Sequence, residues 1–177
     1  MRSFHPKFFL FAITAFIFTA CEKEKNVTPL NIEGKWMVDS STSKVQFQGE
    51  EVDNSTEDLS NTGIYFDFAA NGTYTTNAIL GLGNINKGDG SIYSNEYAIV
   101  DGKVALTFDE ADLKIPITLS FQPQISGDRM TIKLTRNQLV NDIADMSGKI
   151  SGIAQGILEV LVSTIVDFEY TLELVKA

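Results

Sequence analysis

The chain has almost none of the side chains on which metal and nucleophile chemistry most often depends. Its 177 residues include one histidine and one cysteine, His5 and Cys21, both near the amino terminus. The body of the chain therefore offers no Ser-His-Asp or Cys-His nucleophile system. It also offers no zinc site built from His and Cys, no haem with a proximal His and no thiol redox centre.

Basic side chains are also scarce. The chain has 14 Lys and Arg against 23 Asp and Glu, a formal net charge of −9. Arg2 and Lys7 lie within the first 20 residues, so that removing this segment leaves 12 basic side chains against the same 23 acidic ones. A chain of this charge repels nucleic acid and anionic membrane surfaces, and nucleic-acid binding is excluded as a function.

Three chemistries remain open to such a composition: a pair of carboxylates, a Ser-Lys arrangement, or a calcium site with oxygen ligands. Acidic clusters occur at residues 50–53, 57–58 and 109–112. None follows the residue order of a calcium-binding loop, and such clusters are more often solvated loops. We therefore expect no enzyme, no catalytic residue, no metal and no cofactor.

An uncharged apolar run, FFLFAITAFIF, covers residues 8–18 and follows Arg2 and Lys7. A helix needs about 20 residues to cross the hydrocarbon of a bilayer, so this run is too short to serve as an anchor helix. The order of charged and then apolar residues is that of a secretory signal peptide, which we expect to occupy residues 1–20.

The residues Phe18-Thr19-Ala20-Cys21 resemble a bacterial lipobox, although Phe18 stands where leucine is usual. The resemblance implies that Cys21 becomes the first mature residue and carries diacylglycerol on its thiol and a further chain, such as palmitate, on its amine. The alternative is an ordinary signal peptide that leaves a free thiol in an oxidising compartment.

Residues 21–32 then read as a short flexible tether without periodicity. The run Glu22 to Lys25 looks like the charged tether of surface lipoproteins of the Bacteroidetes type. The resemblance implies a lipid-anchored protein of the cell outer membrane, on its periplasmic or its cell-surface face.

From residue 33 to 177 we expect one domain that begins with half-buried strands. Apolar and polar residues alternate in KWMVD, KVQFQ and IYFDF, at residues 35–39, 44–48 and 64–68, which is typical of strands with one buried face. Asn71-Gly72, Asp101-Gly102 and Gly127-Asp128 predict tight hairpins. Residues 49–62 and 81–90 lack the alternation and are expected to be loops at the rim of the sheet.

After Asn137 the apolar period changes from two to three and four, which predicts a helix. Its apolar face comprises Leu139, Ile143, Met146, Ile150, Ile153, Ile157 and Leu161. Gly148, Gly152 and Gly156 form a stripe of small residues, which predicts close helix packing, a close approach of this helix to the sheet, or a break at Gly148. A final alternating run, IVDFEYTLEL at residues 165–174, predicts a strand that closes a sheet or barrel.

Gly34-x-Trp36, followed by Phe66-x-Phe68-x-x-Asn71-Gly72-Thr73-Tyr74, resembles the lipocalin-like domains of bacterial lipoproteins. The resemblance implies a mainly β fold: an antiparallel up-and-down barrel with one helix packed on it before the last strand. It also implies that Trp36 plugs the closed end of the barrel beneath a stacked cation. Lys176, Arg129 and Arg136 are the cations that could take this position.

An eight-stranded barrel is just wide enough to fill with side chains or to hold one small ligand. For a small apolar or amphipathic ligand, the candidate lining residues are Phe66, Phe68, Tyr97, Leu106, Phe108, Leu119, Phe121, Phe168 and Tyr170. The alternative is a filled barrel that acts as a structural or interaction module, contacting an envelope protein or a glycan through its loops.

Overall fold

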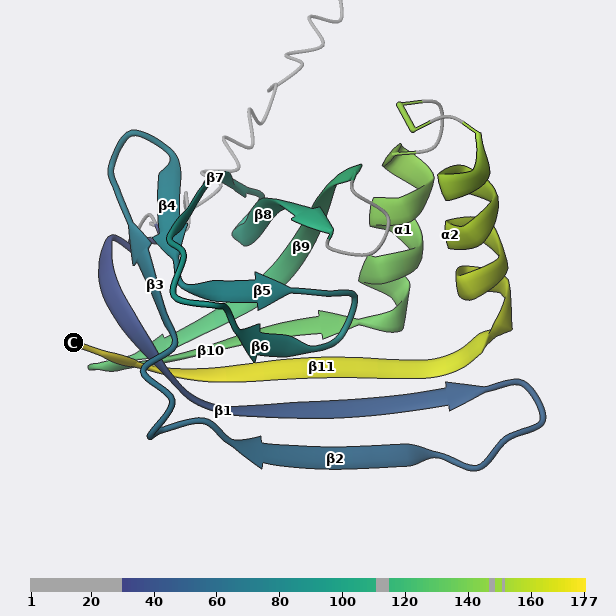
Figure 1. Ribbon diagram of the computed structural model, residues 1–177, viewed down its shortest axis with the longest axis horizontal. Coiled ribbons are helices and arrows are strands. Elements are labelled where there is room, and N and C mark those ends of the chain that lie inside the picture. Colours follow the sequence, from purple (N-terminus) through teal and green to yellow (C-terminus); the bar gives the residue numbers. More distant parts are fainter. Residues whose placement is uncertain (1–29, 111–114, 147–148, 151) are drawn as a thin grey trace, which may run out of the picture.

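The computed structural model describes residues 30–110, 115–146, 149–150 and 152–177 (Figure 1). The predicted signal peptide, Cys21 and most of the predicted tether lie outside these residues. The strands are β1 (Gly34–Phe47), β2 (Asp53–Asp58), β3 (Tyr65–Phe68), β4 (Thr73–Thr76), β5 (Ala78–Leu80), β6 (Ile85–Lys87), β7 (Tyr93–Val100), β8 (Lys103–Glu110), β9 (Ile115–Ser126), β10 (Arg129–Thr135) and β11 (Ile165–Lys176). Two helices, α1 (Arg136–Met146) and α2 (Ile153–Thr164), separate β10 from β11.

The strands form a closed antiparallel barrel. Nine of them make one sheet in the order β11-β10-β9-β8-β7-β4-β3-β1-β2, and the pairing of β11 with β1 closes it into an eight-stranded barrel with β2 outside. The closing pair runs from Trp36, opposite Lys176, to Phe47, opposite Ile165. The predicted fold class, a mainly β antiparallel barrel with helical structure before the last strand, is confirmed.

The three predicted hairpins are present because their turn residues adopt the required backbone angles. Asp101 and Gly102 have φ angles of 51° and 72°, and they join β7 to β8 as the two residues between the paired Val100 and Lys103. Gly72 and Gly127 also have positive φ, at the β3–β4 and β9–β10 turns. Asp-Gly and Asn-Gly tolerate these angles at low cost, which is why they mark hairpins in the sequence.

A bulge in β1 decides which of its side chains enter the barrel. Val38 pairs with Leu174 and Ser40 with Glu173, so that Asp39 is the extra residue. Beyond the bulge, Ser41 is the next side chain to be buried. A second register shift, between Gln46 and Phe47, likewise changes which side chains of β11 face the interior. Ile165 is buried there and Val166 is 54% exposed, so Val166 does not share the buried face with Phe168, and the alternation predicted for residues 165–174 is wrong at that end.

Two segments that were predicted to be loops contain strands. β2 lies within residues 49–62 and pairs with β1 from Ser40 to Val45, beyond the point where β3 ends. All six of its side chains are exposed, which explains why no apolar alternation reveals it. β6 lies within residues 81–90 and pairs with β5 as a separate two-stranded sheet. A segment without any apolar alternation can therefore become a strand when it pairs with the free edge of another strand.

Helix α1 covers a stretch of β9 that pairs with β8 on one side and has no strand on the other. The pairing of β9 with β10 ends at Gln122, opposite Lys133. Asp142 Oδ2 then accepts a hydrogen bond of 2.6 Å from the backbone N–H of Ser120, and Met146 Sδ one of 3.3 Å from Thr118. Side chains of the helix thus replace the missing strand, and this fixes α1 against the outside of the barrel.

The single helix predicted after Asn137 is divided into two. Leu139, Ile143 and Met146 are buried on α1, whereas Ile153 and Ile157 on α2 are 84% and 47% exposed, so the predicted continuous apolar face does not exist. The alternative of a broken helix is therefore the correct one, although Gly148 itself lies outside the described residues.

The two described glycines of the stripe, Gly152 and Gly156, do not bring a helix close to the sheet. A side chain at Gly152 or at Gly156 would meet no atom within 4 Å. Gly152 has a φ of +74° and caps the start of α2. The prediction of close helix packing at these glycines is wrong, and Gly152 instead permits the turn into α2.

Candidate functional site

The two ends of the barrel differ, and β1 connects them. Trp36, near the start of β1, is 1% exposed, and its indole N–H donates a 2.7 Å hydrogen bond to the carbonyl of Ile32. The chain leading into β1 therefore folds over the ring. The ring is thus buried and held in place, and its role as the plug of this end of the barrel stays a prediction.

Lys176 is the cation at Trp36. It lies opposite Trp36 in the β1–β11 pair, with its Nζ 5.4 Å from the centroid of the indole ring. Arg129 pairs instead with Asp39 at 3.4 Å. Arg136 donates from Nε to the carbonyl of Ile165 at 2.7 Å. The cation thus comes from the last strand.

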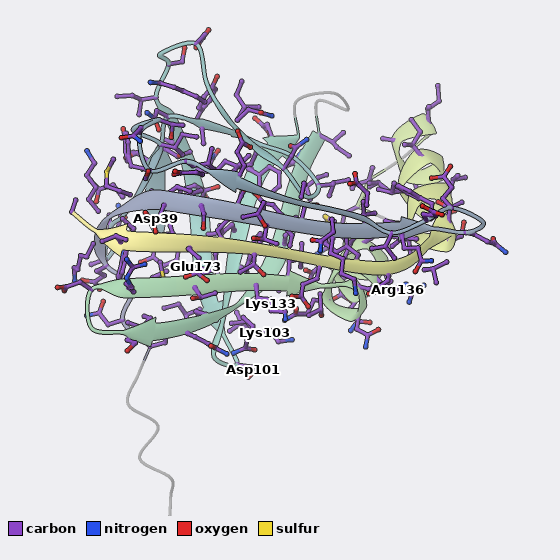
Figure 2. All side chains as sticks on the ribbon, turned by 90° about the horizontal axis from the view of Figure 1, so that it is seen from below. Asp39, Asp101, Lys103, Lys133, Arg136 and Glu173 are labelled. Atoms are coloured by element: carbon purple, nitrogen blue, oxygen red, sulfur yellow. The ribbon has the colours of Figure 1, made fainter. Side chains whose placement is uncertain are left out.

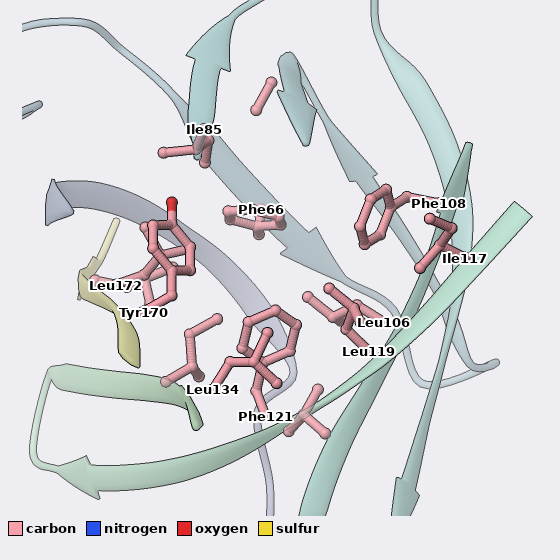
Figure 3. Packing of buried hydrophobic residues seen from close by; sticks show 14 of the residues in the cluster. Phe66, Ile85, Leu106, Phe108, Ile117, Leu119, Phe121, Leu134, Tyr170 and Leu172 are labelled. Atoms are coloured by element: carbon pink, nitrogen blue, oxygen red, sulfur yellow. The ribbon is translucent and has the colours of Figure 1, made fainter. Parts of the chain in front are cut away.

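Eight of the nine predicted lining residues belong to the buried core and Tyr97 packs against it; Figure 3 shows most of the nine. Eight are at most 5% exposed: Phe66, Phe68, Leu106, Phe108, Leu119, Phe121, Phe168 and Tyr170. Tyr97 is partly buried and donates a 2.8 Å hydrogen bond to the carbonyl of Ala69, with its ring edge-on to Phe68 at 5.1 Å. Phe168 is the member of this set that borders the pocket described next. Whether any of the nine contacts a ligand stays a prediction.

An open pocket of about 460 Å³ lies at the end of β1 remote from Trp36, and we call it the mouth pocket. Four elements surround it: the second half of β1, the β5–β6 hairpin, the end of α2 and the start of β11. Its lining residues are Ser43, Val45, Phe47, Ile79, Leu80, Gly81, Leu82, Gly83, Asn84, Asn86, Leu161, Ile165 and Phe168. Its volume falls within the range of about 300–1,000 Å³ that is usual for small-molecule sites.

The β5–β6 hairpin forms one wall of the mouth pocket. At its tip, Gly83 has a φ of +132°, and a Cβ atom there would come within 2.9 Å of the ring of Phe168. The hairpin is therefore seated closely on β11. The sequence placed residues 81–90 at the rim of the barrel, and residues 81–84 and 86 do line the pocket. Residues 49–62, the other predicted rim segment, contribute none of its lining.

No charged side chain is among the residues that line the mouth pocket. Lys44 has a side chain 43% exposed and binds Asp167 at 2.6 Å. Asp167 in turn raises the pKa of Lys44. The outer wall of the barrel has further charged contacts (Figure 2): Lys133 pairs with Glu169 at 2.7 Å, and Thr131 donates to Glu173 at 2.9 Å. Charge is thus kept on the outside and the mouth pocket is neutral.

One buried hydroxyl in the barrel is left without a partner. Tyr170 is 4% exposed, and among the buried side-chain atoms that the structure describes its Oη lacks a hydrogen bond. Burial raises the pKa of Tyr170, and the neighbouring Ser41 hydroxyl offsets part of that rise. The two hydroxyls nevertheless do not form a hydrogen bond of good geometry. Tyr74 is equally deep, but its Oη donates to the carbonyl of Thr107 at 3.1 Å. The sequence does not reveal that one of these two hydroxyls has a partner and the other has none.

A second hollow, of about 560 Å³, lies outside the barrel between β9 and α1. Asp142, Asp145 and Lys149 line it together with the hydroxyl residues Thr118 and Ser120. Burial raises the pKa of Asp142, while its hydrogen bond from Ser120 works in the opposite direction. Since Asp142 already accepts the backbone N–H of Ser120, its structural role in holding α1 accounts for its position.

Within the described ranges, no three His, Cys, Asp or Glu side chains gather closely enough to hold a metal ion. No helix in this part of the chain is both long and apolar enough to span a membrane. No protein-family model matches the chain, and neither does any curated protein or solved structure. The geometry defines a closed antiparallel barrel with an uncharged pocket at one end.

Proposed function

We propose that this protein is a lipid-anchored, non-enzymatic binding protein of the bacterial cell envelope, of the lipocalin-like kind, which holds a small apolar or amphipathic molecule in the mouth pocket. The anchor is the lipid on Cys21, followed by the tether of residues 21–32. The proposal rests on the mouth pocket, whose volume of about 460 Å³ and uncharged lining suit such a molecule.

The composition of the mouth pocket supports an apolar ligand. Val45 and Phe47 from β1 and Leu161 from α2 converge on it. Burying apolar surface contributes about 25 cal/mol for each Å² removed from water, so a ligand with a short alkyl or ring system gains affinity here. Ser43, Asn84 and Asn86 add a few polar groups that can orient it.

Blocking the mouth pocket is expected to abolish binding. Leu161 lines the pocket from α2 and is partly buried, so Leu161→Trp places a bulky ring within the site. The uncharged fluorescent probe N-phenyl-1-naphthylamine, titrated against the chain from residue 21 onward with Cys21→Ser, should bind the variant at least about tenfold more weakly than the parent chain.

Val166→Trp is the matched control for this block. Val166 lies just after α2, is 54% exposed and does not line the mouth pocket. Its variant carries the same added ring on the outside of the barrel and should bind the probe as the parent does. Equal weakening by both variants, or saturable binding that neither variant changes, would place the probe elsewhere and refute the proposed site.

A further inference from the structure

We infer that the ligand of the mouth pocket is an uncharged amphipathic molecule, and that the buried hydroxyl of Tyr170 donates a hydrogen bond to its carbonyl, ester or hydroxyl oxygen. This inference rests on the proposed function and specifies the chemistry of the ligand. Tyr170 then selects ligands that carry such an oxygen, and the mouth pocket binds the apolar rest of the molecule.

Tyr170 lies next to the mouth pocket along two directions of the sheet. In the β1–β11 pair it is directly opposite Ser43, which lines the pocket. Along β11 it is two residues from Phe168, which also lines the pocket, and both side chains are buried on the inner face. Cross-strand neighbours have Cβ atoms about 5 Å apart, so the tyrosine forms the layer immediately below the pocket.

The hydroxyl of Tyr170 points into the barrel towards the β5–β6 hairpin. Figure 3 shows it directed to the region between Phe66 and Ile85. Ile85 is 2% exposed and lies between Asn84 and Asn86, which both line the mouth pocket. A ligand that passes between β1 and this hairpin therefore meets the hydroxyl at the inner end of its path.

A buried hydroxyl without a partner destabilises the fold, so its presence at Tyr170 indicates that a ligand oxygen satisfies it. Leaving such a group unsatisfied costs about 1–3 kcal/mol, whereas phenylalanine would fill the same space without that cost. Ser41, 8% exposed on the neighbouring strand, adds a second hydroxyl residue to the same layer. A ligand oxygen placed here would satisfy the donor and recover this energy on binding.

The surroundings select against an ionised ligand. Neither the mouth pocket nor the adjoining Tyr170 and Ser41 supply a cation. Lys44 is bound to Asp167, and Arg136 donates to the carbonyl of Ile165. Burying a carboxylate without a counter-charge costs several kcal/mol, while a neutral oxygen needs a single donor. The polar end of the ligand therefore enters first, and its apolar part remains among Val45, Phe47 and Leu161.

The test compares Tyr170→Phe with Tyr74→Phe in the chain from residue 21 onward, with Cys21→Ser. Displacement of N-phenyl-1-naphthylamine measures the affinities of methyl dodecanoate, which is neutral, and of dodecanoate, which is ionised at pH 8. In the parent chain the ester should bind more tightly than the anion. Tyr170→Phe should weaken the ester by about three- to tenfold and leave affinity for the naphthylamine probe within about twofold.

Tyr74→Phe controls for the loss of a buried tyrosine hydroxyl. It removes the bond to Thr107, so its melting temperature should fall by a few degrees while the affinity for the ester is unchanged. Tyr170→Phe removes no bond, and its melting temperature should stay the same or rise.

The outcomes separate the inference from the proposed function. Probe binding with an ester affinity equal in the parent and in Tyr170→Phe would overturn the inference alone, since the hydroxyl would then serve at most a buried water. Dodecanoate binding as tightly as its ester would overturn the uncharged class. Absence of binding by every probe would overturn the proposed function, and the inference with it.

Discussion

Replacing Trp36 by alanine is expected to reduce the free energy of unfolding by about 3–5 kcal/mol, the usual cost of removing a large buried ring. Trp36 is 1% exposed, it receives Lys176 on its ring, and its N–H is bound to the carbonyl of Ile32. The variant loses all three interactions and opens the closed end of the barrel. Since small domains are stable by about 5–15 kcal/mol, a large part of the stability should be lost. Urea denaturation followed by far-UV circular dichroism measures it.

Two milder variants separate the contributions at Trp36. Trp36→Phe keeps most of the apolar ring and loses the bond to Ile32, for which we expect about 1 kcal/mol from the bond and a further cost for the smaller ring. Lys176→Met keeps an apolar stem over the indole and should cost about 0.5–1 kcal/mol. A Trp36→Ala variant destabilised by less than about 1 kcal/mol would show that the tryptophan does not close the barrel.

Replacing Cys21 by serine is expected to abolish lipid labelling of the protein completely. A thiol can accept diacylglycerol, and serine removes the acceptor with a change of one atom. Each buried methylene contributes about 0.8 kcal/mol to membrane binding, so several acyl chains hold a protein almost permanently, and their loss should release it. Growth with alkyne-tagged palmitate, followed by click detection on a gel, reports the lipid directly. An alkaline carbonate wash of the membranes reports the anchor.

Glu24→Ser is the matched control for Cys21→Ser. Glu24 lies three residues after Cys21 and has no thiol to accept diacylglycerol, so we expect this variant to label and fractionate as the parent chain does. Palmitate label that persists in Cys21→Ser, or a parent chain that takes up none, would contradict the anchor. The binding pocket would be untouched by that result, because it is built from residues 43–168.

Local chemistry made much of the barrel predictable. A hairpin turn depends on two or three residues, and Asp101-Gly102 has the same preference for positive φ in any context. The last strand was predicted from its alternation, which reflects one buried face along almost its whole length. The period change at Asn137 predicted helical structure in the same way. In each case the controlling interactions lie within a few residues.

The candidate site could not be predicted because it depends on pairings between distant residues. The bulge at Asp39 arises in the pairing with β11, more than 130 positions away, and it determines that Ser41 faces inward. The β5–β6 hairpin has two three-residue strands, too short for a reliable pattern. The contrast between Tyr170 and Tyr74 depends on whether a carbonyl lies opposite each hydroxyl, as Thr107 does for Tyr74.

Native mass spectrometry of the protein extracted from its own envelope tests the central claim most directly. One small uncharged amphipathic molecule is expected on each wild-type chain, present also in Val166→Trp and missing from Leu161→Trp. A wild-type chain that carries no molecule, or an anionic molecule retained in all three proteins, would contradict a neutral ligand held in the mouth pocket.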